Sequence, residues 1–330
     1  MPFRSGFVSI IGRPNAGKST LLNALVGEKI AIVTHKPQTT RNRIQGIVTI
    51  PKKGKDAGGQ IVFIDTPGIH KPDRTLNKRM MQEVYDALEG CDLLLYMHDA
   101  TQRFSHDDDF TMELVKRAKQ PVILLLNKID LIPKPQLLGV IAQFSEMHKF
   151  KEIIPISAAK GSGLEVLQKK VLENLPAGPH YFPDDQITDQ PERFLAAEII
   201  REHVLILAHK EVPYATTVMV EQWEERPKLT RIAAAIFVER DGQKAIVIGR
   251  GGEMLKRIGS NARRELEKLL NTKVFLELFV KVQAGWRDSR HFVEQLDWHR
   301  QLEEMGEGLI TEREPLRAVR QPAKDRTPKD

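Results

Sequence analysis

The chain has 330 residues, of which 41% are hydrophobic and 28% are charged, values typical of a globular protein with two domains. The formal net charge of +6 permits a polyanionic partner. The single cysteine excludes an internal disulfide. No apolar run approaches the roughly 18 residues that span a bilayer. A start that runs directly into a strand pattern, without a signal-peptide pattern, favours a cytoplasmic protein.

The first motif is a phosphate-binding loop at 12–19, GRPNAGKS, which fits the pattern G-x-x-x-x-G-K-[ST] between a strand-like and a helix-like run. Gly12 and Gly17 let the backbone wrap tightly, so that successive N–H groups converge on a phosphate at the N-terminus of the next helix. Lys18 can then reach the outer phosphates, and Ser19 can bind Mg²⁺. The residues expected to contact the nucleotide here are Gly12, Arg13, Pro14, Asn15, Ala16, Gly17, Lys18, Ser19 and Thr20.

Two further segments are expected to complete the metal and phosphate site. A polar loop contains Thr39 and Thr40, and we expect Thr40 to close onto Mg²⁺ and the γ-phosphate. After a glycine-rich hairpin connection at 51–60, an apolar strand ends in DTPG at 65–68; its carboxylate suits the metal through a water, and its glycine can donate an N–H to the γ-phosphate. The predicted catalytic residues are Lys18, Thr40, Asp65 and Gly68, and the predicted Mg²⁺ site is Ser19, Thr40 and Asp65.

Residue 69 bears on the mechanism. Many GTPases place a glutamine directly after this glycine to orient the attacking water. Ile69 cannot hydrogen-bond a water, so we expect slow intrinsic hydrolysis or a positioning group from elsewhere. Thr66, Pro67 and Ile69 are also predicted nucleotide contacts.

A second motif, NKID at 127–130, ends a buried strand and is expected to bind the base. Guanine differs from adenine at its N1–H and 2-amino donors, and one carboxylate, that of Asp130, can accept both. A later turn, SAA at 157–159, can place backbone N–H groups near the base. The predicted base contacts are Asn127, Lys128, Ile129, Asp130, Ser157, Ala158 and Ala159.

Helices are expected over 77–88, 107–118, 136–148 and 164–175, with buried strands over 92–97 and 121–127. This alternation predicts an α/β fold with a doubly wound, mainly parallel sheet and the ligand at the carboxyl ends of its strands. A proline-containing segment at 176–194 predicts a linker that packs on a domain. Pro191 should then open a buried helix that is apolar on nearly all faces.

The second half contains a candidate RNA-binding turn. Three strand-like runs are predicted at 215–223, 230–240 and 243–249, and GRGG at 249–252 lies between the last of them and a basic, amphipathic helix. This is the G-x-x-G arrangement of a KH module, which lets a single-stranded backbone lie against the turn. A strand at 274–282 and a closing helix follow, with Trp286 and Trp298 as packing anchors; 306–330 is expected to be largely disordered. The predicted RNA contacts are Gly249, Arg250, Gly251, Gly252, Lys256, Arg257 and Arg263.

The motifs GRPNAGKS, QTTR, DTPG, NKID, SAAKGSG and IGRGGEMLKRIG, in this order, resemble those of the bacterial Era family of GTPases. The resemblance implies a P-loop GTPase domain at 1–178, a linker at 179–192 and an α+β type II KH domain at 193–302, with 303–330 as a tail outside the likeness. It implies GTP/GDP and Mg²⁺ as ligands, and binding of the 3′ end of 16S rRNA in assembly of the small (30S) ribosomal subunit and 16S rRNA maturation. A monomer with peripheral contact to an anionic membrane on its cytoplasmic face is also expected.

The chain also resembles GTPases with a hydrophobic residue at position 69, several of which use a monovalent cation held partly by the P-loop asparagine, here Asn15, so K⁺ dependence is a hypothesis for this chain. We expect GTP to order the loops at 34–43 and 66–76 and thereby to bias the KH domain between RNA-competent and occluded placements. His98 departs from the family, which more often has a small apolar residue there, and the histidines show no paired metal spacing. Two alternatives remain open: a P-loop ATPase or small-molecule kinase, and an RNA-binding protein with a vestigial nucleotide site.

Overall fold

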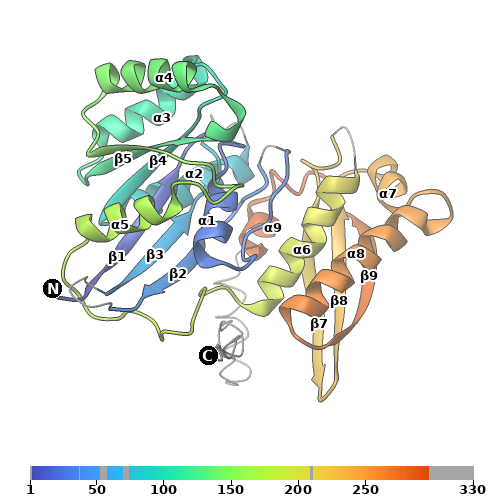
Figure 1. Ribbon diagram of the computed structural model, residues 1–330. Coiled ribbons are helices and arrows are strands. Elements are labelled where there is room, and N and C mark those ends of the chain that lie inside the picture. Colours follow the sequence, from blue (N-terminus) through green and yellow to red (C-terminus); the bar gives the residue numbers. More distant parts are fainter. Residues whose placement is uncertain (1, 37, 53–57, 70–73, 209–210, 297–330) are drawn as a thin grey trace, which may run out of the picture.

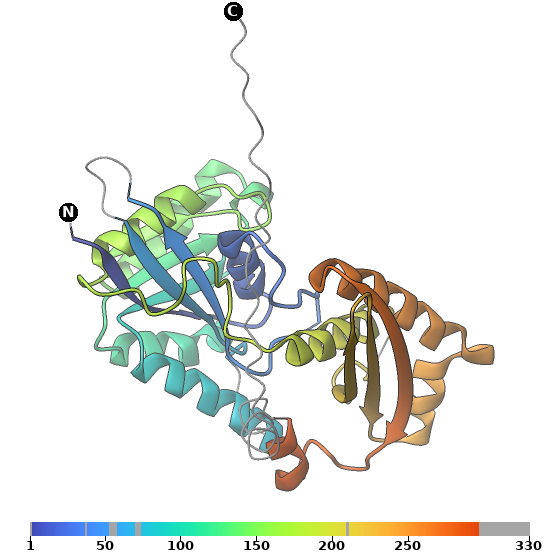
Figure 2. The same ribbon diagram turned by 90° about the horizontal axis from the view of Figure 1, so that it is seen from below.

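Two domains lie side by side in the computed structural model of the chain, in the view of Figure 1 and in the view from below in Figure 2. The structure describes residues 2–36, 38–52, 58–69, 74–208 and 211–296. The first domain has a six-stranded sheet between two layers of helices, and the second has a three-stranded sheet. Among the described residues, no helix is long and apolar enough to cross a membrane.

The first sheet has the strand order β2-β3-β1-β4-β5-β6, and all neighbouring pairs are parallel except β2–β3. The predicted doubly wound, mainly parallel sheet is therefore confirmed, and the antiparallel β2–β3 pair confirms the hairpin, whose segment 53–57 lies outside the described residues. The strands are β1 (Arg4–Ile11), β2 (Ile44–Ile50), β3 (Gly59–Asp65), β4 (Leu93–Asp99), β5 (Val122–Asn127) and β6 (Glu152–Pro155).

Four helices of this domain, α2 to α5, begin and end within two residues of the predicted bounds. Helices α1 and α5 cover one face of the sheet, and α2, α3 and α4 cover the other, each against its own apolar core. The helices are α1 (Lys18–Val26), α2 (Thr75–Glu89), α3 (His106–Arg117), α4 (Lys134–Met147) and α5 (Leu164–Asn174), with a short 3₁₀ helix, η1 (Ile129–Leu131), after β5.

The segment between the domains packs on the first sheet, as predicted. The N–H of Ile47 on β2 donates to the carbonyl of Ile187 over 2.8 Å, and Thr188 Oγ1 donates to the carbonyl of Gln45. The Gln60 side chain hydrogen-bonds the backbone of Phe182. The linker is thus held along the outer edge of the sheet.

The second domain has the strand order β7-β8-β9, with β7–β8 antiparallel and β8–β9 parallel. Its core lies between this sheet and helices α6, α7 and α8. The elements are α6 (Glu192–Leu207), β7 (Thr217–Arg226), β8 (Leu229–Val238), α7 (Asp241–Ile248), α8 (Glu253–Leu269) and β9 (Lys273–Val282), and α9 (Arg290–Gln295) follows.

The strand predicted at 243–249 is wrong, because this run forms helix α7. The parallel strands β8 and β9 need a helical crossover between them, and α7 with α8 supplies it. The Gln243 side chain accepts the backbone N–H groups of Glu239 and Arg240 at the start of α7, and Ile246 is 43% exposed, so only one face is buried. The GRGG turn therefore joins two helices rather than a strand and a helix.

Helix α6 is buried as predicted, but it also buries charge. Arg201 and Glu202 are 1% and 3% exposed, and both contact the first domain. Trp286 is fully buried in a cluster with Leu76 and Met80 of α2, which confirms it as a packing anchor between the domains. Trp298 and the predicted tail at 306–330 lie outside the described residues.

Candidate nucleotide-binding site and its contacts with the second domain

The loop at 12–19 runs from the end of β1 to the start of α1 and is shaped for an anion. Gly17 has φ 105°, and a Cβ at this position would overlap the Asn127 side chain, so a larger residue does not fit. The Lys18 ammonium donates to the carbonyls of Gly12 and Arg13, each over 3.1 Å. Burial lowers the pKa of Lys18 to about 8, although the Asp65 carboxylate acts against this shift. A polyphosphate would supply the anionic partner that this buried ammonium needs.

The three residues predicted to bind Mg²⁺ are brought together. Ser19 Oγ donates to Asp65 Oδ2 over 2.6 Å, and Thr40 Oγ1 lies 2.8 Å from Ser19 Oγ and 3.3 Å from Asp65 Oδ2. Asp65 is fully buried, and burial raises its pKa to about 6 against the effects of Lys18 and its hydrogen bonds. Its Oδ1 has no hydrogen-bond partner in the described part of the chain. Buried oxygen donors with an unsatisfied carboxylate oxygen fit a hard divalent cation.

The segment after β3 packs directly on the phosphate loop. Thr66 Oγ1 donates to the carbonyl of Ile10, and the N–H of Ile69 donates to the carbonyl of Gly12 over 3.2 Å. A Cβ on Gly68 would lie 2.8 Å from Pro14 Cα, so this approach requires glycine. The Ile69 side chain is 3% exposed within the apolar core, so it offers nothing polar to a water.

Asn127 connects the two predicted halves of the site. Its Nδ2 donates to the carbonyl of Ala16 over 2.8 Å, and its Oδ1 accepts the N–H of Ala158 over 3.0 Å. Lys128 has φ 64° and ion-pairs with Asp99 over 2.6 Å. Because Asn127 is 3% exposed, it acts as a brace between the phosphate loop and the 157–159 turn.

A cavity of about 680 Å³ is lined by most of the predicted base-side residues, and a smaller adjoining pocket of about 50 Å³ is lined by Ser19 and Thr40 of the predicted metal site. Exposed Asp130 lines the larger one, and Gly68 and Thr40 line the smaller. Seven predicted residues line neither pocket: Gly12, Asp65, Thr66, Pro67, Ile69, Ile129 and Ala158.

The sequence interpretation missed part of the cavity wall. His98 and Asp99 at the carboxyl end of β4, and Asp108 on α3, line the larger cavity. Their position at the end of a strand parallel to β1 and β5 was a signal that could have found the first two.

The GRGG turn is exposed between α7 and α8. Gly249, Gly251 and Gly252 have φ of 74°, 58° and 82°, which explains why glycine recurs here. In the described chain, a Cβ on Gly251 or Gly252 would meet no atom within 4 Å, so this backbone is open to a ligand. Arg250, Lys256 and Arg257 are exposed, but Arg263 is ion-paired with Glu267 over 2.9 Å and is less available than predicted.

The loop that contains Thr40 is hydrogen-bonded to the second domain. The Arg41 guanidinium donates to the carbonyls of Thr216 over 2.8 Å and Tyr214 over 3.3 Å, and it lies 5.4 Å from the centre of the Trp286 ring. Burial, followed by the charge of nearby Arg201, lowers the pKa of Arg41 well below its usual value. Arg201 itself donates to the backbone carbonyl of Thr39.

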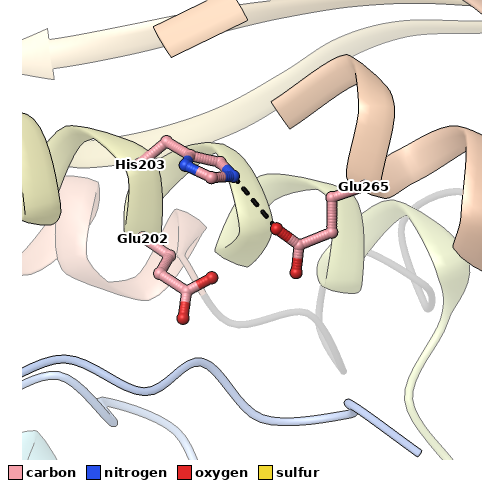
Figure 3. Close-up of side chains that lie close together, drawn as sticks. All are labelled: Glu202, His203 and Glu265. Carbon is pink, nitrogen blue, oxygen red and sulfur yellow. Dashed lines mark hydrogen bonds and ion pairs between the residues drawn. The ribbon is translucent and has the colours of Figure 1, made fainter. Parts of the chain in front are cut away.

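A second link between the domains is an ion-pair cluster that sequence spacing did not reveal. Figure 3 shows Glu202 and His203 of α6 facing Glu265, with His203 Nε2 3.0 Å from the Glu265 carboxylate. Lys29 of the first domain bonds both carboxylates, and the N–H of Val33 donates to Glu202. The three acidic and imidazole groups lie within 4.8 Å of one another, but the Lys29 ammonium already provides their counter-charge.

The comparisons with known proteins match both halves of the chain. Residues 7–128 match the family model described as 50S ribosome-binding GTPase, and residues 211–287 match the KH domain model. The GTPase Era proteins of Geobacter sp. and Geobacter metallireducens are 51% and 53% identical to the chain, with 90% of this chain and 98% of each relative covered.

Two crystal structures resemble the whole fold. One is of a variant of Era from Aquifex aeolicus bound to GDP and AlF₄⁻, with a TM-score of 0.85 and 40% identity over 89% of this chain and 99% of that one. The other is of Era in complex with MgGDPNP and nucleotides 1506–1542 of 16S rRNA, with a TM-score of 0.85 and 40% identity over 90% of this chain and 99% of that one.

The fold, the phosphate loop and the G-x-x-G turn thus define a P-loop GTPase that carries a KH domain. At this identity and coverage, the chain belongs to the Era family of GTPases. The ATPase or kinase alternative and the vestigial-site alternative are therefore not supported.

Proposed function

We propose that this chain hydrolyses GTP with Mg²⁺ and binds the 3′ end of 16S rRNA through its KH domain, in assembly of the small ribosomal subunit and maturation of 16S rRNA. The observation that carries the proposal is the likeness, over 90% of this chain, to Era in complex with MgGDPNP and nucleotides 1506–1542 of 16S rRNA, with a TM-score of 0.85 at 40% identity. The open GRGG turn with exposed Arg250, Lys256 and Arg257 supports it, because such a turn leaves room for a phosphodiester backbone.

The roles in hydrolysis follow from the contacts of the nucleotide site. Lys18 and the loop N–H groups neutralise charge on the β- and γ-phosphates, which is most of what phosphoryl transfer requires of a protein. Ser19 and Thr40 would hold Mg²⁺ directly and Asp65 through a water, and the ion would neutralise charge that develops between the two phosphates. The N–H of Gly68 is proposed to meet the γ-phosphate, and Asp130 the guanine base.

The attacking water needs a positioning group other than residue 69, because the Ile69 side chain is apolar and buried. We propose slow intrinsic hydrolysis that is accelerated by K⁺ held partly by Asn15. Asn15 has φ 63°, lines both pockets and donates to the carbonyl of His35 over 3.0 Å, so it lies where the loops meet. Turnover in K⁺ and in Na⁺ tests this role, and equal rates would contradict it.

The loop that contains Thr40 is proposed to transmit the change from GTP to GDP to the KH domain. GTP would order the loops at 34–43 and 66–76, of which 37 and 70–73 lie outside the described residues. Arg201 is bonded to Thr39, and Arg41 is bonded to Thr216, so a shift of Thr40 away from the metal would strain contacts with α6 and the segment before β7. These contacts give hydrolysis a physical route to a change in RNA binding.

The test uses an RNA oligonucleotide with the sequence of the 16S rRNA 3′ end. Replacement of Arg250 and Gly251 by Asp in one variant should abolish RNA binding and spare GTP binding, because the turn lies outside the nucleotide site. Arg226→Asp is the matched charge reversal, since Arg226 is an exposed residue of β7 paired with Glu224. Undiminished RNA binding by the double variant would overturn the proposal.

The cellular location is proposed to be the cytoplasm, with a monomer that makes peripheral contact with the cytoplasmic face of an anionic membrane. The net charge of +6 is compatible with such contact. Cosedimentation with phosphatidylglycerol vesicles tests the membrane part, and absence of binding at low salt would contradict it. We likewise propose the domain bounds 1–178, 179–192 and 193–302, which limited proteolysis would test.

A further inference from the structure

A second cavity, of about 70 Å³, lies where the two domains meet. Its walls include the end of the loop at 34–43 and α2 from the first domain, and α6 and β7 from the second. Among the described residues, none lines both this cavity and a pocket of the nucleotide site. The proposed function assigns no ligand to it.

The charged lining of this cavity is mostly arginine. In the described part of the chain, its charged side chains are four arginines and one glutamate: Arg41, Arg79, Arg193, Arg201 and Glu198. Most of the other lining side chains are apolar. An excess of positive charge among apolar walls favours an anion, because little solvent is present to screen the charge.

Arg41 has a donor that no described residue uses. The side chain is 6% exposed, and its two terminal nitrogens donate to the backbone carbonyls of Thr216 and Tyr214. Its Nε has no hydrogen-bond partner within the described ranges. Both acceptors are uncharged, so they satisfy two nitrogens without neutralising the guanidinium. A buried charge in this position is stabilised by an anionic partner.

Arg201 presents the same situation from the opposite wall. It is 1% exposed, and its Nε and Nη2 donate to the two carboxylate oxygens of Glu198 over 2.8 Å and 2.6 Å. Its Nη1 has no partner in the part of the chain that the structure describes. Burial and then the charge of Arg201 lower the pKa of Arg41 well below its usual value, although Glu198 acts against this shift. One glutamate thus does not offset the repulsion between the two guanidiniums.

We propose that this cavity binds one inorganic phosphate ion, held by the buried Arg41 and Arg201 and by the more exposed Arg79 and Arg193. Phosphate oxygens accept several N–H groups at once, and the planar guanidinium matches their geometry. The cavity is several times the roughly 10–15 Å³ that one water needs, so an oxyanion fits. It has about a tenth of the volume of the 680 Å³ cavity at the nucleotide site, which is too little for a nucleotide.

The bound ion would link the two domains. Arg41 follows Thr40 in the loop at 34–43, whereas Arg201 and Arg193 belong to α6, so one phosphate would contact both. Phosphate is also the ion that the proposed GTP hydrolysis releases, so the protein itself would supply it. A ligand that binds this arrangement of the domains and not others stabilises it.

Binding of radioactive inorganic phosphate to the full-length protein, measured by equilibrium dialysis, tests the site. The protein is first saturated with MgGDPNP, so that the phosphate loop is occupied and no phosphate is released, in a chloride buffer of constant ionic strength. The natural chain should bind one phosphate ion. Arg41→Gln and Arg201→Gln should each weaken phosphate binding about tenfold or more, because each removes a buried, charged donor.

Arg226→Gln, at an exposed ion pair of β7 outside the cavity, is the control and should keep the phosphate affinity of the natural chain. Thermal unfolding of each variant shows whether it is folded. Arg193→Gln provides a second measurement if the buried variants are not folded, because Arg193 is partly exposed, and it should weaken phosphate binding about threefold or more.

Three results would overturn the proposal. One is natural phosphate affinity in the folded cavity variants. Another is loss of phosphate binding in Arg250→Gln instead, which would place the ion at the GRGG turn. The third is a natural chain that binds no phosphate at concentrations up to about 10 mM.

Discussion

Arg201 of the KH domain donates a hydrogen bond to the backbone carbonyl of Thr39, the residue before Thr40 of the proposed magnesium site. The Arg201 side chain is 1% exposed and also ion-pairs with Glu198 over 2.6 Å. A buried guanidinium that loses an acceptor leaves a costly unsatisfied donor. Helix α6 and the 34–43 loop are therefore expected to move together when the nucleotide changes.

Arg201→Gln should weaken the dependence of RNA affinity on nucleotide. We expect any difference in RNA affinity between the GDP state and the GTP-analogue state to shrink by about fivefold or more, because the variant loses the charged donor to Thr39. Fluorescence anisotropy with the 16S rRNA 3′-end oligonucleotide measures it. Arg226→Gln, at an exposed ion pair of the same domain, should leave the difference unchanged. An unchanged difference in Arg201→Gln would show that the loop and α6 are not coupled through this bond.

Asp130→Asn should change the base preference of the cavity. The carboxylate can accept two donors of guanine, whereas an amide turns a donor toward them, so we expect GTP affinity to fall about 100-fold and xanthosine nucleotides to become the better ligands. Competition binding with GTP and XTP checks this. Asp109→Asn, at an exposed acid on α3, is the control and should retain GTP binding. A preference for GTP that survives in Asp130→Asn would remove this residue from the base site.

Gly17→Ala should damage the phosphate loop. The new Cβ would overlap Asn127 Nδ2 at a residue with φ 105°, so we expect a loss of about 1–3 kcal/mol in the free energy of unfolding and loss of nucleotide binding. Gly139→Ala is the matched control: Gly139 lies within α4, and a Cβ there meets no described atom within 4 Å. That variant should gain about 0.5–1 kcal/mol in chemical denaturation. Equal stability changes in the two variants would contradict the packing argument.

Glu265→Gln should make the stability of the protein less sensitive to acid. Although burial opposes it, hydrogen bonding from His203 and Lys29 and their charges lower the pKa of Glu265 to about 2. A carboxyl group whose pKa is lowered in the folded state stabilises the folded protein at pH values above its ordinary pKa of 4.5. That stabilisation is lost as the pH falls toward 2. The Glu265 side chain is only 25% exposed. We therefore expect the variant to be about 1–2 kcal/mol less stable than the natural chain at pH 7, and this difference in the free energy of unfolding should become smaller below pH 4.

Free energies of unfolding measured from pH 3 to pH 7 give the comparison for Glu265→Gln. Glu277→Gln is the control, because Glu277 and its partner Arg231 are each 42% exposed and their ion pair should contribute little. A difference between the natural chain and Glu265→Gln that stays constant across this range would mean that the cluster does not link protonation to stability.

The nucleotide site could be predicted from the sequence because each of its motifs is local. Lys18, Asp65 and Asn127 each end or follow a buried strand, and the carboxyl ends of parallel strands meet at one edge of a sheet. The roles of these residues then follow from their chemistry. The alternation of strand-like and helix-like runs was sufficient to predict the fold of the first domain.

Sequence patterns did not predict those features of the structure that depend on contacts between residues far apart in the chain. The run at 243–249 is rich in β-branched residues and was interpreted as a strand, but it forms α7, which is part of the crossover between the parallel strands β8 and β9. Likewise, Glu202 and Glu265 are 63 positions apart, and only the packing of α6 against α8 brings them to Lys29. Charged residues on helices have many possible partners, so their pairing could not be inferred from the sequence.

The linker bonds to β2 have a consequence for any shortened form of this protein. An outermost strand exposes a row of unpaired N–H and C=O groups, which is a template for pairing with a strand from another molecule. Ile187 and Thr188 occupy that row beside Ile47 and Gly46. A fragment that ends at residue 178 would expose the edge of β2 and is expected to self-associate. A fragment that extends to residue 191 would keep the linker residues that cover this edge and is expected to remain monomeric.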